Sequence, residues 1–148
     1  MTIRVQRDDF DIAAEVDALK RANNATGSVV TFIGTVRNDD GLSWLTLEHY
    51  PGMAQREIGT HVAEAKSRWP LTGVTVIHRI GRLRVGDNIV LVVVTSSHRQ
   101  AAFAAAEFLM DYVKTRAPFW KQEQRGESAK WVNSREQDQE AAIRWLKD

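Results

Sequence analysis

The 148-residue chain contains no cysteine. Without a thiol it can form no disulfide bond, offer no thiolate to a metal and use no cysteine nucleophile, so a reducing compartment is allowed without being required. Glycine and proline are sparse, at 9 and 3 residues. Gly52, Gly81 and Gly86 are isolated turn residues, and no glycine-rich phosphate loop is present.

Neither sign of charge is in excess, with 20 Lys+Arg against 19 Asp+Glu. Bulk charge therefore gives no support to nucleic-acid binding, and any basic site must be local. The apolar runs are far too short to span a bilayer, and the N-terminal segment is charged where a signal peptide needs an apolar core. We expect a cytoplasmic protein.

The length and a hydrophobic fraction of 43% are enough for one domain with a core, which we place at residues 1–148. Apolar spacing predicts a helix after a cap at Asp11, ending near Asn23, and a second helix over 55–69. A capping box at Ser97 and Gln100 predicts a long helix that ends before Pro118. That helix should turn inward Ala102, Phe103, Ala106, Leu109, Met110 and Val113. A last helix is expected over 134–147.

Strands are predicted at the N-terminus and over 28–36, 43–50, 74–80 and 88–95, with a short candidate at 130–132. The segment 88–95 is nearly all aliphatic and should be buried on both faces. The stretch 122–128 is polar. The mixed order of elements favours an α+β fold with a mainly antiparallel sheet and helices on one face.

Three polar clusters stand at the ends of predicted elements, where functional residues often lie. They are Arg37, the pair His98 and Arg99, and the segment Lys114–Lys121. Taken singly, each is more typical of a solvated turn or helix end than of a site. Cations at a helix start oppose the helix dipole, so His98 and Arg99 favour an anion site such as a phosphate or carboxylate.

Lys114 lies near the other end of the same predicted helix, among cations and aromatic residues. The neighbouring cations Arg116 and Lys121 favour a neutral amine, whereas the helix dipole favours a charged one. The sequence thus leaves open whether Lys114 is a general base, a nucleophile or a stabiliser of charge.

His98 and Lys114 are sixteen positions apart on one helix, or roughly 24 Å at 1.5 Å per residue. One small ligand cannot touch both within one chain. Either the two ends form separate sites, or a symmetric dimer brings them together; we predict the dimer.

No metal site or cofactor is expected. His49, His61 and His78 lack the spacing of metal ligands, and no cysteine can complete a set.

Five blocks of sequence stand in an order that is typical of one enzyme family. They are Phe32–Arg37, Leu47–Met53, Val76–Gly81, Ser97–Arg99 and Lys114–Lys121. Together they resemble the large, catalytic subunit of molybdopterin synthases. The likeness extends from about Phe32 to the last helix, and only 38–43 and 122–128 look particular to this chain.

The resemblance implies an α/β-hammerhead-type fold and a sulfurtransferase that works without a cysteine of its own. It implies a heterotetramer, in which a central homodimer binds two small ubiquitin-like subunits. Each small subunit carries sulfur as a C-terminal thiocarboxylate, and the substrate is cyclic pyranopterin monophosphate. The product, molybdopterin, carries the two dithiolene sulfurs and leads to the molybdenum cofactor.

The resemblance also assigns roles to individual residues. Lys114 and Lys121 take the catalytic positions. The substrate-binding positions are Thr35, Val36, Arg37, His98, Arg99, Lys114, Lys121, Gln122 and Glu123. Arg135 is a weaker candidate for a further anion contact.

Two other classes of protein agree with the same residues. A non-catalytic adaptor could bind a ubiquitin-like tail through Phe119 and Trp120, and turnover would distinguish it from an enzyme. An RNA-binding module also mixes basic and aromatic residues, but the balanced charge argues against it.

Overall fold

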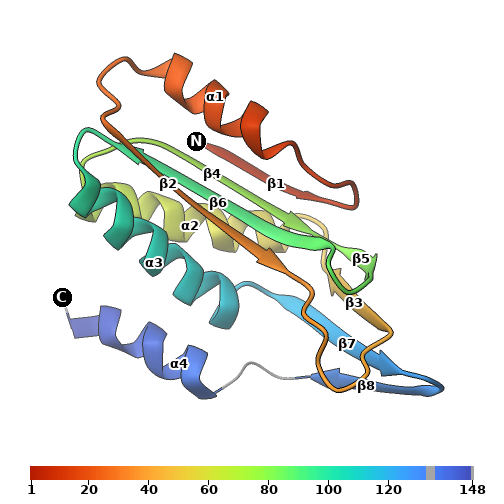
Figure 1. Ribbon diagram of the computed structural model, residues 1–148. Helices are drawn as coiled ribbons and strands as arrows, with labels where there is room; N and C mark the ends of the chain where they lie inside the picture. The colour runs from red at the N-terminus through yellow and green to blue at the C-terminus, as the bar shows by residue number, and fades with distance from the viewer. Residues whose placement is uncertain (133–135, 148) are drawn as a thin grey trace.

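The chain folds into two four-stranded sheets with helices packed on them (Figure 1). A computed structural model describes residues 1–132 and 136–147. The first sheet has the order β1 (Thr2–Gln6), β4 (Leu71–Arg79), β6 (Asn88–Ser96) and β2 (Ser28–Thr35). The second has the order β5 (Gly81–Leu83), β3 (Trp44–His49), β7 (Phe119–Arg125) and β8 (Ser128–Val132).

The first sheet is antiparallel except for the parallel pair of β1 and β4. The predicted α+β class with a mainly antiparallel sheet is confirmed. Helices cover both faces of this sheet, however, with α1 (Ile12–Ala22) on one and α2 (Met53–Arg68) and α3 (Arg99–Thr115) on the other (Figure 1). The expectation of helices on one face was wrong, because the aliphatic strand β6 points side chains to both faces: Leu91 toward α1, and Val92 toward α2 and α3.

The starts of two helices test the predicted caps. Asp11 caps α1, accepting a hydrogen bond from the Ala14 backbone N–H at 3.1 Å, as expected. The capping box at Ser97 was wrong, because the Ser97 hydroxyl donates to the Ala25 carbonyl at 3.0 Å and His98 stands at the N-cap of α3. Phe103 was also predicted to face inward, yet it is 62% exposed on α3.

The second sheet depends on a strand that the sequence pattern did not reveal. The polar stretch 122–128 carries no predicted strand, but Gln122 to Arg125 continue β7, which pairs with β3 on one side and β8 on the other. Neighbouring strands satisfy the backbone of this polar segment, so it forms a strand without apolar alternation. The short candidate at 130–132 is confirmed as part of β8.

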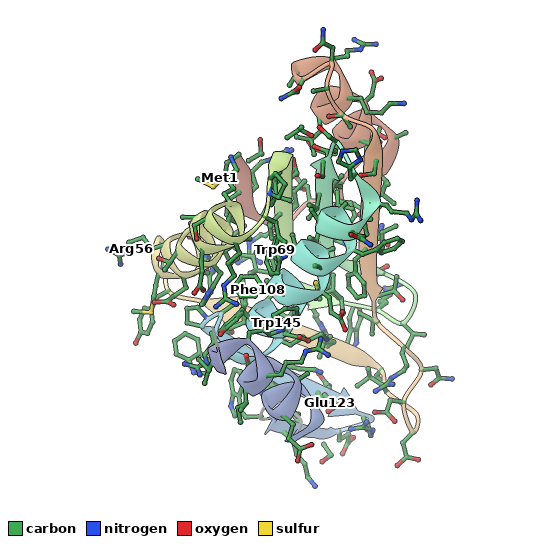
Figure 2. The ribbon with its side chains drawn as sticks, turned by 90° about the vertical axis from the view of Figure 1, so that its left-hand side faces the viewer. Met1, Arg56, Trp69, Phe108, Glu123 and Trp145 are labelled. Atoms are coloured by element: carbon green, nitrogen blue, oxygen red, sulfur yellow. The ribbon has the colours of Figure 1, made fainter. Side chains whose placement is uncertain are left out.

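The C-terminal end packs on this chain, a question that the sequence left open. Helix α4 (Glu136–Ile143) leads into a short 3-10 turn (Arg144–Lys147), and Trp145 lies against Trp69 and Phe108 (Figure 2). The Trp145 indole N–H donates to Asp111 Oδ2 at 2.6 Å. Among the described residues, no helix has both the length and the apolar character needed to span a membrane.

Candidate functional site

The two predicted catalytic lysines lie on either side of the junction between α3 (Arg99–Thr115) and β7 (Phe119–Arg125). Lys114 is in the last turn of α3, and the Arg116 and Ala117 amides both donate to the Tyr112 carbonyl, at 2.7 and 3.2 Å, to end the helix. The chain then enters β7, in which Lys121 is the third residue. Lys114 is exposed, whereas Lys121 is half-buried.

Three stacked rings hold the start of β7 in place. The Phe119 ring lies 3.8 Å from the His78 ring, at 14°, and 6.3 Å from the His49 ring, at 28°. His49 is also the backbone partner of Phe119 between β3 and β7. Phe119 is therefore held between two histidines from different strands, and its ring is not free to stack on a nucleotide base, which weakens the RNA-binding alternative.

His78 is neutral in this setting. Its pKa is lowered to about 4, mainly by burial, with smaller contributions from the charges of Lys114 and His49 and against a backbone hydrogen bond to Arg79 that raises it. The Nδ1 atom lies 2.8 Å from the Arg79 carbonyl, which can only accept, so the proton is assigned to Nδ1. A neutral ring adds no positive charge beside Lys114.

This lowered pKa predicts a loss of stability in acid. In the unfolded chain the pKa of His78 is near its ordinary value of 6.5, whereas in the folded chain it is about 4. Between these two pH values the unfolded chain binds a proton at His78 that the folded chain does not. The free energy of unfolding should therefore have its full value above pH 6.5 and fall by about 3 kcal/mol as the pH drops to 4. His61, whose pKa burial also lowers, adds to the same slope. Urea unfolding at several pH values measures the slope.

The variant His78→Phe should flatten that slope, because phenylalanine keeps a ring against Phe119 but takes up no proton. The exposed His98 provides the control, since His98→Asn should leave the slope unchanged. A His78→Phe protein with the natural slope would contradict the assignment to His78.

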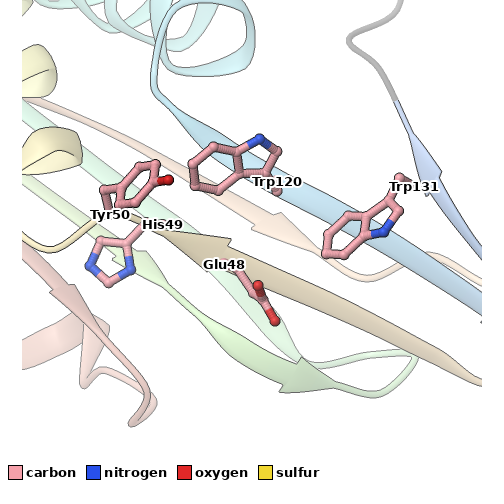
Figure 3. A pocket seen from close by; sticks show the side chains of 5 residues that line it. All are labelled: Glu48, His49, Tyr50, Trp120 and Trp131. Carbon is pink, nitrogen blue, oxygen red and sulfur yellow. The ribbon is translucent and has the colours of Figure 1, made fainter.

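Neighbouring residues of β7 point to opposite faces of the second sheet. Lys121 pairs with the buried Leu47, so its side chain shares the inner face, whereas Trp120 pairs with the exposed Glu48 on the outer face. An open pocket of about 490 Å³ is lined by Glu48 and Trp120 of this outer face together with His49, Tyr50 and Trp131 (Figure 3). We call these five residues the aromatic shelf.

The predicted pair Gln122 and Glu123 is divided by the same alternation. Gln122 pairs with Trp131 of the shelf, whereas Glu123 pairs with the buried Leu45. Only Glu123 shares a face with Lys121.

Arg37 begins the loop that follows β2. Thr35 is exposed at the end of the strand, where the register with β6 shifts. Val36 is 3% exposed, and its backbone accepts from Gly86 at 2.7 Å and donates to Asp87 at 2.9 Å. Of these three predicted substrate contacts, Val36 thus lies in the core, where it anchors Arg37, which is exposed.

His98 and Arg99 lie at the far end of α3 from Lys114, as Figure 1 shows for the two ends of the helix. Together with Gln100 they line a second, open pocket of about 250 Å³. The structure therefore does not bring them to the lysines within one chain. Arg135 lies outside the described residues.

Sequence reasoning missed several residues of this region. His78 was set aside as an ordinary histidine, and no local signal distinguishes it from His61. Arg125 belongs to the polar stretch 122–128, for which no role was predicted, although its guanidinium binds the loop that carries Arg37. Trp131 could have been found, since a tryptophan at an exposed strand position is unusual.

Comparison with known proteins gives one consistent result. The family model described as MoaE protein matches residues 5–116. A molybdopterin synthase catalytic subunit of Mesorhizobium japonicum is 59% identical over 147 residues, which is 97% of this chain and 92% of that protein. The structure of the molybdopterin biosynthesis MoaE protein from Burkholderia ambifaria is 47% identical, covers 99% of both chains and has a TM-score of 0.86.

A more distant structure shares the fold alone. It is a complex of subunits 1 and 2 of molybdopterin-converting factor from Helicobacter pylori, 19% identical to this chain with a TM-score of 0.76 over 90% of it and 91% of that chain. The family match over most of the chain and the high identity to the Mesorhizobium protein decide the assignment. The chain belongs to the MoaE protein family, together with relatives that are named molybdopterin synthase catalytic subunits.

Proposed function

We propose that this chain is the catalytic subunit of a molybdopterin synthase, which converts cyclic pyranopterin monophosphate to molybdopterin in molybdenum cofactor biosynthesis. The observation that carries the proposal is the 59% identity to a catalytic subunit of that name over 97% of the chain. Sulfur delivered from outside, as the C-terminal thiocarboxylate of a small ubiquitin-like subunit, agrees with a chain that has no cysteine.

In each sulfur transfer the thiocarboxylate sulfur forms a bond to an oxygen-bearing carbon of the pterin side chain, and the C–O bond of that carbon breaks, so that the oxygen leaves on the phosphate or as water. The product of this step is an acyl thioester. Water then cleaves the acyl–sulfur bond, so the small subunit leaves as a carboxylate and the sulfur stays on the pterin. Negative charge develops on the acyl oxygen during this cleavage, and an ammonium group beside it lowers the barrier. Lys114 and Lys121 are the groups proposed for this stabilisation, with proton transfer as the alternative role of Lys114.

The anionic pterin phosphate needs charge-assisted donors. Arg37 and Arg99 offer planar guanidinium forks, and the N-terminus of α3 at His98 adds backbone N–H groups and a favourable dipole. Arg99 is roughly 22 Å from Lys114 along one helix, so a single chain cannot supply both to one pterin.

We therefore propose that two copies share each site, with His98 and Arg99 serving the partner subunit's lysines. Exposed apolar side chains support an association through β2 and α3. Phe32 and Ile33 are 39% and 37% exposed on β2, the edge strand of the first sheet, and Phe103 is 62% exposed on α3. An edge strand of this kind favours pairing with another chain.

The aromatic shelf is the proposed contact for the small ubiquitin-like subunit. Tyr50 and Trp120 meet edge to face at 5.0 Å, and Trp120 and Trp131 are 45% and 58% exposed. Exposed tryptophan and tyrosine side chains are typical of protein interfaces. The shelf adjoins the start of β7, so a tail that crosses it comes close to the end of α3, where Lys114 lies. We also propose a cytoplasmic location, where reducing conditions preserve a thiocarboxylate.

The test combines the purified chain with thiocarboxylated small subunit and cyclic pyranopterin monophosphate, and follows dithiolene product. We expect product at about 1 mole per mole of pterin consumed, with two thiocarboxylates used for each. Binding of the small subunit is measured separately. A folded chain that binds the small subunit but forms no product would refute the enzyme and favour the adaptor.

A further inference from the structure

One arginine of β7 holds the loop that carries Arg37. Arg125 is the last residue of the strand, and its guanidinium donates from Nε to the Asp40 carbonyl at 3.0 Å and from Nη2 to the Asp39 carbonyl at 2.9 Å. Both carbonyls belong to the segment 37–43 between β2 and β3. A single planar side chain therefore binds two successive carbonyls of one loop.

The loop has a shape that needs such a partner. Asp40 and Gly41 have φ values of +53° and +75°, so the backbone turns sharply through the left-handed region, which is costly for Asp40. The Leu42 amide donates to the Asp39 carbonyl at 3.2 Å and closes the turn, while the Leu42 side chain is buried. The Asp39 and Asp40 carbonyls in this turn are not part of a strand ladder, and the Arg125 guanidinium supplies hydrogen bonds to them.

Acidic groups orient the guanidinium. Glu123 Oε2 lies 3.3 Å from Arg125 Nη2, and Asp39 Oδ2 lies 3.9 Å from it. The Glu123 side chain is only 15% exposed, so its charge is little screened by water. Glu123 shares the inner face of β7 with Lys121, and the ion pair thus ties the arginine to the strand that carries the lysine.

Arg37 is consequently placed between two anchors. Before Arg37, the backbone of Val36 is hydrogen-bonded to the backbone of Gly86 and Asp87. After it, the Arg125 guanidinium is hydrogen-bonded to the carbonyls of Asp39 and Asp40. Ser43 then joins β7 through its amide, which donates to the Gln124 carbonyl at 2.8 Å. Only Arg37 and Asn38 lie between these two anchors, so the backbone of Arg37 has little freedom to move relative to Lys121.

We propose that Arg125 is a positioning residue, which presets the loop 37–43 so that Arg37 meets the anionic pterin without an ordering cost. This inference rests on the proposed function. Arg125 acts through the loop and does not itself touch the substrate. A preordered loop strengthens binding because the conformational entropy is lost on folding and not on association.

The kinetic test compares Arg125→Ala, Arg37→Ala and the double variant. We expect Arg125→Ala to raise KM for the pterin about tenfold, with kcat changed by less than about threefold, since an ordering cost acts on binding. Because Arg125 works through Arg37, the double variant should have nearly the KM of Arg37→Ala. Arg125→Lys should not rescue the effect, because an ammonium group cannot bind both carbonyls in fork geometry.

Hydrogen exchange gives a readout that does not depend on turnover. In Arg125→Ala the amides of Leu42 and Ser43 should exchange at least about tenfold faster, with the thermal midpoint near that of the natural chain. Arg21→Ala is the control, since Arg21 is an exposed arginine whose ion pair with Asp17 lies within α1. It should change neither KM nor exchange.

Two results would overturn the inference: KM effects that multiply in the double variant, or unchanged exchange at Leu42 and Ser43. If the natural chain forms no product, the proposed function fails by itself. The exchange rates then still decide whether Arg125 orders the loop, so the two failures are distinguishable.

Discussion

Replacing Lys114 with alanine should lower kcat about 100- to 1000-fold while the chain stays folded and binds the small subunit. An amine that stabilises developing negative charge in an active site contributes on this scale, and a group that transfers a proton contributes similarly. Lys114 is exposed in the last turn of α3, so its loss leaves no cavity in the core. Single-turnover formation of dithiolene product measures the effect without the steps of product release.

The control for this variant is Lys66→Ala. Lys66 is likewise an exposed lysine in the last turn of a helix, α2, and its removal should leave kcat within about twofold. A Lys114→Ala enzyme with nearly natural turnover would remove Lys114 from the catalytic positions.

Lys114→Arg separates the two roles that the sequence left open. Arginine keeps the positive charge but does not give up its proton in proteins. Retained turnover in Lys114→Arg would indicate charge stabilisation, whereas a loss as large as in Lys114→Ala would indicate proton transfer.

The second large effect concerns the proposed sharing of sites between two chains. Lys114→Ala and Arg99→Ala should each be nearly inactive alone at low pterin concentration. When the two variants are mixed and allowed to exchange subunits, each mixed dimer has one site with Lys114 of one chain and Arg99 of the other. Half the dimers are then mixed, and half their sites are intact, so about a quarter of the natural turnover should return.

The mixing experiment includes its own control. Two variants that remove the same group, Lys114→Ala and Lys114→Gln, cannot restore a site in any combination. If the Lys114→Ala and Arg99→Ala mixture also stays inactive after demonstrated subunit exchange, the lysine and the helix start do not serve a common site across the dimer.

The sequence was sufficient wherever local chemistry decides the structure. Asp11 has the side chain that a helix start requires, and it caps α1 as expected. The aliphatic run of β6 predicted a strand buried on both faces. The order of the family blocks placed Lys114 near a helix end and Lys121 just beyond it, because these positions depend only on spacing along the chain.

Only the tertiary structure decided the features that depend on partners distant in sequence. Gln122 to Arg125 form a strand because β3 and β8 pair with them, and the strand then points Lys121 and Trp120 to opposite faces. His78 is neutral because folding buries it against Phe119, forty-one positions away. Arg125 reaches the carbonyl of Asp39, eighty-six positions away, only after both sheets have formed. These features are stabilised by strand pairing, burial and hydrogen bonds between residues far apart in sequence. A local pattern of residues therefore cannot predict them.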